Sequence, residues 1–587
     1  MSRRTRFALV FVVVLLVIST SGVASLDASN QELLTGLTRT VNGQTVGPEE
    51  FTITEERIIQ NAYGVSYRRV EAGLSGSIDG YTCKPTTSPN VGLSRGANND
   101  DFTDAPDFRM RQEGNTQEFF HGIGKYYADE GSGFTFFLPD SAENWNGKMY
   151  VIAHGAGSYG AVRELVPREP DIGSPHTGSN TGFVGLLIDK GYAVAYTRRL
   201  AGGSGLPVTL DDGTILENKV FGHHVGLIRD YTLVAKRYVE SQLGREPDRT
   251  YFWGKSAGAS LGQLINYLPG GNLDAAGQRV FDGLINNDPG GGWQWPILYV
   301  DGKDVLFRTD ADKENFVPQI NVAHLGYVGN TLVVGDYPVV KRQNARILNA
   351  KGLGSKSRTY EVVGVSHSDA GSTFPPTEGV NENIELGGLF DALFDILDRW
   401  VEQGIEPPPT RSDAPDLGDA DRDGYNENPA IRMPEVACPT GVYYLYPEGC
   451  KNTSLTGFAA YLDDRPAINH FGYPVRYPAI NALINDFRTL DVPFDENWLE
   501  PLNQFGYPVD MNGNGTRDTR DTITEAWQRR AIQGYTTGTL GYNETLTHAK
   551  YVSAVSKVAS DLHKQEFLTD KYLIYYIEQA IRSNIGK

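Results

Sequence analysis

Short apolar runs alternate with helix-like patterns from about residue 119 to residue 403. Almost entirely apolar runs, typical of strands buried on both faces, are found at 134–138, 148–153, 191–196, 250–253, 283–286, 331–335 and 360–365. Apolar residues recur every three or four positions over 223–243, and further helices are expected at about 257–267 and 386–403. This alternation predicts an α/β fold, with a mostly parallel sheet covered by helices on both faces.

The pattern is weaker on either side of this core. Partly alternating stretches such as 65–70 predict edge strands in the N-terminal segment. Pro407-Pro-Pro-Thr410 and an Asp-rich stretch mark a boundary, after which a mixed C-terminal extension ends in two amphipathic helices at about 545–565 and 569–585. We expect these helices to pack on the core.

The N-terminus has the three parts of a secretory signal. Basic residues precede an unbroken apolar run from Phe7 to Ile18, and small residues follow up to Ser25. The run is shorter than the about 20 residues that a membrane span needs. We therefore expect a secreted, extracellular protein that has no membrane partner once the signal is removed. The predicted organisation is a signal peptide at 1–25, an N-terminal segment at 26–118, the α/β core at 119–405 and the extension at 406–587.

Charge and cysteine content fit that compartment. Loss of Arg3, Arg4 and Arg6 with the signal takes the formal charge from −19 to −22, and so acidic a chain is not expected to bind nucleic acid. In an oxidising compartment Cys438 and Cys450 could close a short loop.

A serine lies where an apolar strand is expected to turn into a helix. Ser256 is the centre of Gly254-Lys-Ser-Ala-Gly258, the G-x-S-x-G pattern of a nucleophile elbow. Small neighbours permit the sharp turn that lifts the hydroxyl clear of the sheet. The helix that follows points its N-terminus at the site, which favours a developing oxyanion.

The glycine-rich sequence His154-Gly-Ala-Gly157 directly follows an earlier predicted strand. In an elbow-type hydrolase this loop supplies one of the oxyanion amides. We predict that the amides of Gly155 or Ala156, together with that of Ala257, form the oxyanion hole, and that His154 is structural.

A serine nucleophile needs a base and an acid further along the chain. His367 lies just past the last predicted strand and is the predicted base, whereas His324 lacks that context. Asp336, at the end of the preceding strand, is the predicted acid, and Asp288 is the alternative. Asp369 is interpreted as a residue that orders the loop around His367.

Together these motifs resemble the α/β-hydrolase superfamily over about 120–405. More narrowly, Leu397-Asp-Arg-Trp-Val-Glu-Gln-Gly-Ile-Glu-Pro-Pro408 and Ile431-Arg-Met-Pro-Glu-Val436 resemble a family of extracellular α/β-hydrolase domain proteins. The resemblance implies esterase-like chemistry and a C-terminal part wrapped onto the core. Tannase-type esterases are also similar but carry cysteines beside the catalytic Ser and His, where this chain has Lys255, Ala257, Ser366 and Ser368.

Two acidic loops in the extension have calcium-like spacing. The first loop, 510–521, has Gly515 at the turn, and the second, 419–427, repeats the first half of the pattern. The predicted ligands are Asp510, Asn512, Asn514, Thr516, Asp518 and Asp521 in the first loop, and Asp419, Asp421, Asp423, Tyr425 and Glu427 in the second. The expected role of calcium is structural, and no cofactor is expected for catalysis.

The function predicted from these motifs is a secreted serine hydrolase that cleaves carboxylic esters, small or polymeric, through an acyl-enzyme. Three alternatives stay open: a peptidase that uses the same triad, a depolymerase of polyesters or cell-wall esters, and a binding protein that has lost catalysis.

Overall fold

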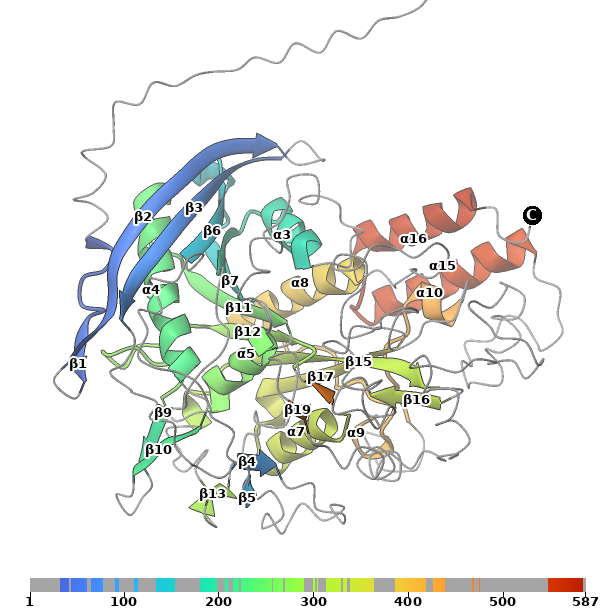
Figure 1. Cartoon of the computed structure of the whole chain (residues 1–587). Helices are drawn as coiled ribbons and strands as arrows, with labels where there is room; N and C mark the ends of the chain where they lie inside the picture. Colours follow the sequence, from blue (N-terminus) through green and yellow to red (C-terminus); the bar gives the residue numbers. More distant parts are fainter. Residues whose placement is uncertain are drawn as a thin grey trace, which may run out of the picture.

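The buried runs of the sequence form one large sheet in the computed structural model of the chain (Figure 1). The structure describes residues 32–41, 44–60, 65–77, 90–93, 110–113, 133–153, 180–197, 206–209, 215–220, 223–255, 257–267, 270–289, 299–300, 303–304, 313–328, 331–334, 338–363, 386–418, 426–438, 467–468, 474–475, 547–583 and 587.

The central sheet has eleven strands among the described residues, in the order β1-β2-β3-β6-β8-β7-β11-β12-β15-β16, with β17 also paired to β15. Its strands are β1 (Arg39–Val41), β2 (Gln44–Gln60), β3 (Ser66–Ser77), β6 (Gly133–Pro139), β7 (Lys148–Ala153), β8 (Ala193–Thr197), β11 (Arg249–Lys255), β12 (Gly283–Asn287), β15 (Gln319–Val328), β16 (Thr331–Val334) and β17 (Ser357–Val363). The six strands β8, β7, β11, β12, β15 and β17 are parallel to their neighbours in this group, whereas β1, β2, β3 and β6 extend one side of the sheet in antiparallel fashion.

Helices cover both faces of the parallel part. The helices are α3 (Asn180–Asp189), α4 (His223–Leu243), α5 (Ala257–Tyr267), α7 (Pro338–Ala350) and α8 (Gly387–Gln403). Along β7, Met149, Val151 and Ala153 belong to the apolar cluster of α4 and α5, while Tyr150 and Ile152 belong to the cluster of α3 and α8. Successive side chains of a strand point to opposite faces, so a strand covered on both sides reads as a continuous apolar run.

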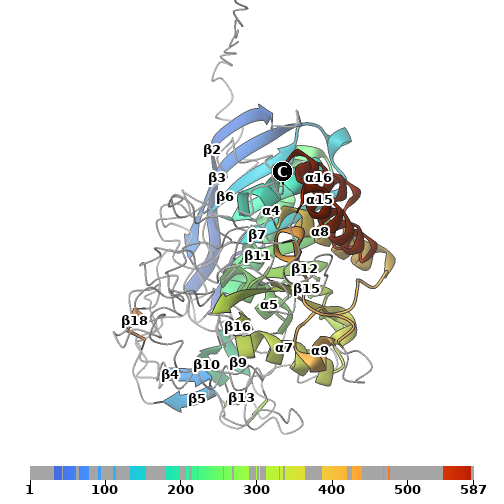
Figure 2. The ribbon, with the colours of Figure 1, turned by 90° about the vertical axis from the view of Figure 1, so that its right-hand side faces the viewer.

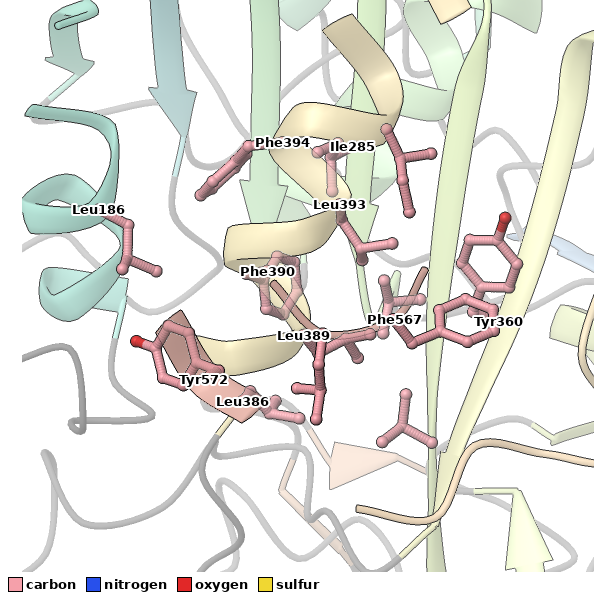
Figure 3. Close-up of a cluster of buried hydrophobic side chains, with 14 of the residues drawn as sticks. Leu186, Ile285, Tyr360, Leu386, Leu389, Phe390, Leu393, Phe394, Phe567 and Tyr572 are labelled. Atoms are coloured by element: carbon pink, nitrogen blue, oxygen red, sulfur yellow. The ribbon is translucent and has the colours of Figure 1, made fainter. Parts of the chain in front are cut away.

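The helix α8 lies at the centre of the second face. Its side chains Leu389, Phe390 and Leu393 are buried in one cluster with Ile285 of β12 and with Phe567 from the C-terminal part of the chain (Figure 3). The helix ends at Gly404, whose φ of 67° is the left-handed conformation that glycine adopts at low cost.

Two C-terminal helices, α15 (His548–Lys564) and α16 (Asp570–Arg582), lie side by side over α8 (Figures 1 and 2). Between them Phe567 packs edge-to-face on Tyr360 of β17, with ring centroids 5.0 Å apart. The hydroxyl of Thr569 donates to a carboxylate oxygen of Asp391 on α8 at 2.7 Å. The end of the chain is therefore anchored to the strand β17 as well as to α8.

The remaining described elements are small. They are the strand pairs β4 (Asn90–Leu93) with β5 (Met110–Glu113), β9 (Leu206–Thr209) with β10 (Ile215–Val220), β13 (Tyr299–Val300) with β14 (Lys303–Asp304) and β18 (Ala467–Ile468) with β19 (Pro474–Val475), the 3-10 turns η3 (Ala142–Asn144) and η4 (Gly354–Lys356), and the short helices α9 (Pro415–Gly418) and α10 (Pro434–Ala437).

Most elements expected from the sequence are confirmed, including the helices at 223–243 and 257–267. The expectation for 331–335 is wrong in one respect: β16 is a strand, but it is antiparallel and forms a hairpin with β15. The parallel strand at this position is β15, which the apolar pattern did not reveal.

Within the described residues, no helix has the length and apolar character required to cross a membrane. The predicted signal peptide and Cys450 lie outside those residues, and Cys438 is buried.

Candidate active site

Ser256, His367 and the glycine-rich loop of Gly155 and Ala156 follow the ends of parallel strands in the sequence, whereas Asp336 follows the antiparallel strand β16. The ends of β7 and β11 are neighbours, with Ala153 paired to Gly254. On the other side of β11, Lys255 pairs with Asn287 at the end of β12. From β7 the chain continues to β8 in one direction, and from β11 it continues to β12 and β15 in the other. The ends of β7 and β11 therefore form the switch point at which open α/β sheets bind ligands.

The predicted nucleophile elbow lies at this switch point. The strand β11 ends at Lys255 and the helix α5 begins at Ala257, so the described chain turns from strand to helix across Ser256, which itself lies outside the described residues. A Cβ on Gly254 would lie 2.3 Å from the carbonyl oxygen of Gly258 and 2.7 Å from the amide nitrogen of Ala259. Only glycine permits this approach of β11 to the first turn of α5.

The segments expected to carry the acid and the base start on opposite edges of β15. Leu325 of β15 pairs with Val334 of β16 and also with Val363 at the end of β17. Asp336 comes two residues after Val334, and His367 comes four residues after Val363. Both predicted residues lie outside the described residues, as do Gly155 and Ala156, which follow the end of β7.

A buried polar cluster surrounds the strand ends next to the elbow. It consists of Lys255, Asn287, Asp288, His324 and Lys341, all buried. The Nζ of Lys255 lies 3.5 Å from Nδ1 of His324, and Nε2 of the same imidazole lies 2.8 Å from Oδ1 of Asn287. One carboxylate oxygen of Asp288 accepts the backbone N–H of His324 at 3.0 Å and a hydrogen bond from the Lys341 ammonium.

The backbone at Asp288 is unusual. Its φ is 52°, and only one other described non-glycine residue, Glu566, has a positive φ. Non-glycine residues in this region are held there by their surroundings and concentrate at functional sites. Sequence analysis named Asp288 as the alternative acid and set His324 aside as the base, but the cluster that joins them was not predicted. The signal available beforehand was a lysine inside the elbow motif, where small residues are usual.

A second buried network, made of neutral groups, fixes α5 to the sheet. Oδ1 of Asn321 accepts hydrogen bonds from Gln263 of α5 and from Asn286 of β12, each at 3.0 Å. The side-chain nitrogen of Asn321 donates to the hydroxyl of Ser357 on β17 at 3.3 Å. Tyr267, at the end of α5, accepts hydrogen bonds from Gln319 and Asn344 at 3.0 Å, and burial raises the pKa of its hydroxyl. The elbow helix is thus held by oriented hydrogen bonds in addition to apolar packing.

Of the residues proposed to bind calcium, only Glu427 is described, and it is exposed. Its neighbour Asn426 donates to the carbonyl of Ser412 at 2.8 Å. The described part of the chain holds no group of three acidic, histidine or cysteine side chains arranged to bind a metal. The other predicted ligands in 419–425 and 510–521 lie outside the described residues.

The family comparison agrees with this architecture. Residues 228–479 match the model of a family described as an alpha/beta hydrolase domain. No curated protein matches the chain.

Solved structures that resemble it include a fungal esterase from Rhizomucor miehei, 11% identical over 54% of this chain and 77% of that one, with a TM-score of 0.24. Others are carboxyl esterase 2 from Tuber melanosporum (14% identity, 39% and 70% coverage, TM-score 0.23) and a poly(3-hydroxybutyrate) depolymerase from Bordetella parapertussis (15%, 49% and 89%, TM-score 0.26).

The family match includes the elbow motif, the predicted acid and the predicted base, and the sheet has parallel strands with helices on both faces. The chain has the α/β-hydrolase fold, and residues 228–479 are similar to the alpha/beta hydrolase domain family.

Proposed function

We propose that this protein is a serine hydrolase that cleaves carboxylic esters, with Ser256 as nucleophile, His367 as general base and Asp336 as the residue that orients His367. The observation that carries the proposal is the register of the strand ends. The ends of β11, β16 and β17 lie within a few residues of the three candidates, and all belong to the carboxyl side of the parallel sheet. This order along the chain, Ser, then Asp, then His, is the order used by elbow-type hydrolases.

The reaction follows from these roles. The Ser256 hydroxyl attacks the ester carbonyl while His367 takes its proton, and the alcohol leaves with that proton. Water then attacks the acyl-enzyme, again with His367 as base, and releases the acid. The tetrahedral oxyanion would be bound by the amides of Gly155 or Ala156 and by that of Ala257. The position of Ala257 as the first residue of α5 supports this assignment, because helix N-termini favour anions.

Secretion and calcium binding belong to the same proposal. The basic and apolar start of the chain supports export, and the spacing of 510–521 and 419–427 supports structural calcium. Bound calcium would show as a rise in the melting temperature that EDTA reverses.

The experiment combines labelling with a substrate panel. The purified mature protein is treated with a fluorophosphonate, and peptide mass spectrometry should locate the label on Ser256. Ser256→Ala should lose both the label and the hydrolysis of p-nitrophenyl esters. Ser241→Ala is the matched control, because Ser241 lies on α4 and its hydroxyl donates only to the carbonyl of Tyr238 in the same helix.

The outcomes separate the alternatives. Ester cleavage that survives in Ser256→Ala would refute the proposal. Faster cleavage of aminoacyl-nitroanilides than of esters would favour a peptidase, and release of soluble products from a polyester would favour a depolymerase. Absence of both label and turnover in the folded wild-type protein would favour a binding protein.

A further inference from the structure

The cluster of Lys255, Asn287, Asp288, His324 and Lys341, called here the edge cluster, connects the elbow to the segment that carries the predicted acid. Lys255 is bonded directly to Ser256. His324 and Lys341 lie on the two sides of the segment 325–340, which contains Asp336. The cluster therefore touches one neighbour of the nucleophile and both ends of the acid segment.

We propose that the edge cluster is a positioning device that holds the acid-bearing segment in register with the nucleophile elbow. The inference rests on the function proposed above. Its members are positioning residues, because they act through Ser256 and Asp336 and not on the substrate.

The central contact is a single oxygen atom. Oδ1 of Asp288 accepts the backbone N–H of His324 and the ammonium of Lys341, so it closes a loop at both ends of 325–340. Asp288 is itself fixed by its backbone N–H, which donates to the carbonyl of Val322 at 2.7 Å. The positive φ of Asp288 turns the chain away from β12 directly after the strand ends at Asn287. An extended residue at this position would continue the strand.

His324 connects Asp288 and the acid-bearing segment to the elbow through the contact of its imidazole with Lys255. Its Nε2–H donates to Oδ1 of Asn287, which leaves Nδ1 as the acceptor that faces the ammonium of Lys255. The distances fit a neutral imidazole between an amide oxygen and an ammonium. Oδ2 of Asp288 lies 3.7 Å from Nδ1, beyond hydrogen-bond distance. His324 thus contacts Lys255 and Asn287 through its ring and Asp288 through its backbone N–H.

The chemical consequence concerns both geometry and charge. A misplacement of the catalytic groups by about 1 Å lowers the rate about a hundredfold, so loosening the loop 325–340 should lower kcat more than it raises KM.

The charge of Lys255 has a separate effect. A buried ammonium next to the elbow disfavours the protonated form of the proposed base. Replacement of Lys255 should therefore move the acid limb of the pH profile for kcat/KM to higher pH.

The test uses three variants in the full-length mature protein. His324→Gln and Asp288→Asn are expected to lower kcat about 10- to 100-fold with KM changed less than about threefold. Lys255→Met is expected to move the acid limb upward by about half a pH unit or more. Lys148→Met is the matched control: Lys148 is the first residue of β7, at the opposite end of the sheet, and it pairs with Asp398 and Glu402. It should leave the acid limb in place even if stability falls.

Each outcome decides between roles. Asp336→Asn should lose about 10⁴-fold in kcat if Asp336 is the acid. An equal or larger loss in Asp288→Asn would overturn the positioning role and make Asp288 the acid. The positioning role would also be refuted if His324→Gln kept the wild-type kcat, or if Lys255→Met left the acid limb of the pH profile in place. If His324→Gln fails to fold, the Lys255→Met pH profile still decides. Loss of activity in Ser256→Ala alongside unaffected cluster variants would refute only this inference, whereas full activity in Ser256→Ala would refute the proposed function.

Discussion

Substitution of Gly254 by alanine tests whether the close approach of β11 to α5 sets the geometry of the elbow. The added methyl group would lie 2.3 Å from the carbonyl oxygen of Gly258, 2.4 Å from its carbonyl carbon and 2.7 Å from the nitrogen of Ala259. All three atoms are backbone atoms in the first turn of α5. No side-chain rotation can relieve the contact, so strand and helix must separate.

The size of the shift follows from these distances. Ordinary contacts of a Cβ begin near 3.4 Å, so the first turn of α5 must move by about 1 Å. Overpacking of this kind costs about 1–3 kcal/mol of stability. A 1 Å misplacement of the proposed nucleophile Ser256 and of the proposed oxyanion amide of Ala257 should lower kcat/KM by about a hundredfold. Loss of activity should therefore exceed what partial unfolding can explain.

The assay measures ester kcat/KM, the rate of fluorophosphonate labelling and the midpoint of thermal unfolding. Gly73→Ala is the control, because a Cβ there meets nothing closer than the carbonyl oxygen of Thr52 at 3.9 Å. Gly73 lies on β3, in the antiparallel part of the sheet, and its variant should keep full activity. Wild-type kcat/KM in Gly254→Ala, in a protein whose stability has fallen, would refute the link between helix position and chemistry. An equal loss of activity in Gly73→Ala would make the effect nonspecific.

Three further predictions concern stability. Phe567→Ala should destabilise the protein by about 3–5 kcal/mol in urea unfolding, because the ring is fully buried against Tyr360, and a loss below 1 kcal/mol would contradict this packing. Arg342→Met should cost about 3–5 kcal/mol by leaving the buried carboxylate of Glu361 without its guanidinium, and addition of Glu361→Gln should restore part of the loss. Burial raises the pKa of Asp282, so its charged form is disfavoured in the folded state and the contribution of Asp282 to stability should fall as pH rises from about 4. Asp282→Asn should then be relatively more stable at pH 7 than at pH 4, and a difference independent of pH would contradict this.

The apolar pattern of the sequence correctly predicted the strands whose two faces are both apolar. It did not predict elements that bury polar side chains. In β15 the buried Gln319, Asn321 and His324 interrupt the apolar pattern. In α7 the buried Lys341 and Asn344 do the same to the helical period. These side chains are inside because each has a partner on another element, and that partner is distant in sequence. Periodicity compares a residue only with its neighbours in the chain, so it counts such positions as exposed.

For the candidate site, the chain order of motifs was accessible from the sequence, but the polar support around them was not. The elbow is a local turn between adjacent elements, and its Gly-rich pattern reflects the nearby Gly254 and Gly258. The edge cluster instead brings together Lys255, Asp288 and Lys341 from three separate parts of the fold. Nothing in the separation of these residues along the chain specifies their contact. It follows from the parallel register of β11, β12 and β15.

Charged side chains are more deeply buried at the carboxyl end of the parallel sheet than at its amino end. This difference supports a functional role for the carboxyl end. At the amino end Lys148 pairs with Asp398, and the two side chains remain 15% and 19% exposed, so both charges keep some contact with water. At the carboxyl end Lys255, Asp288 and Lys341 are buried, where desolvation of charges costs several kcal/mol each. An apolar set of similar volume would stabilise the sheet at least as well. Oriented charges at the nucleophile elbow therefore make sense as a contribution to the reaction, and the Lys255→Met pH profile measures that contribution directly.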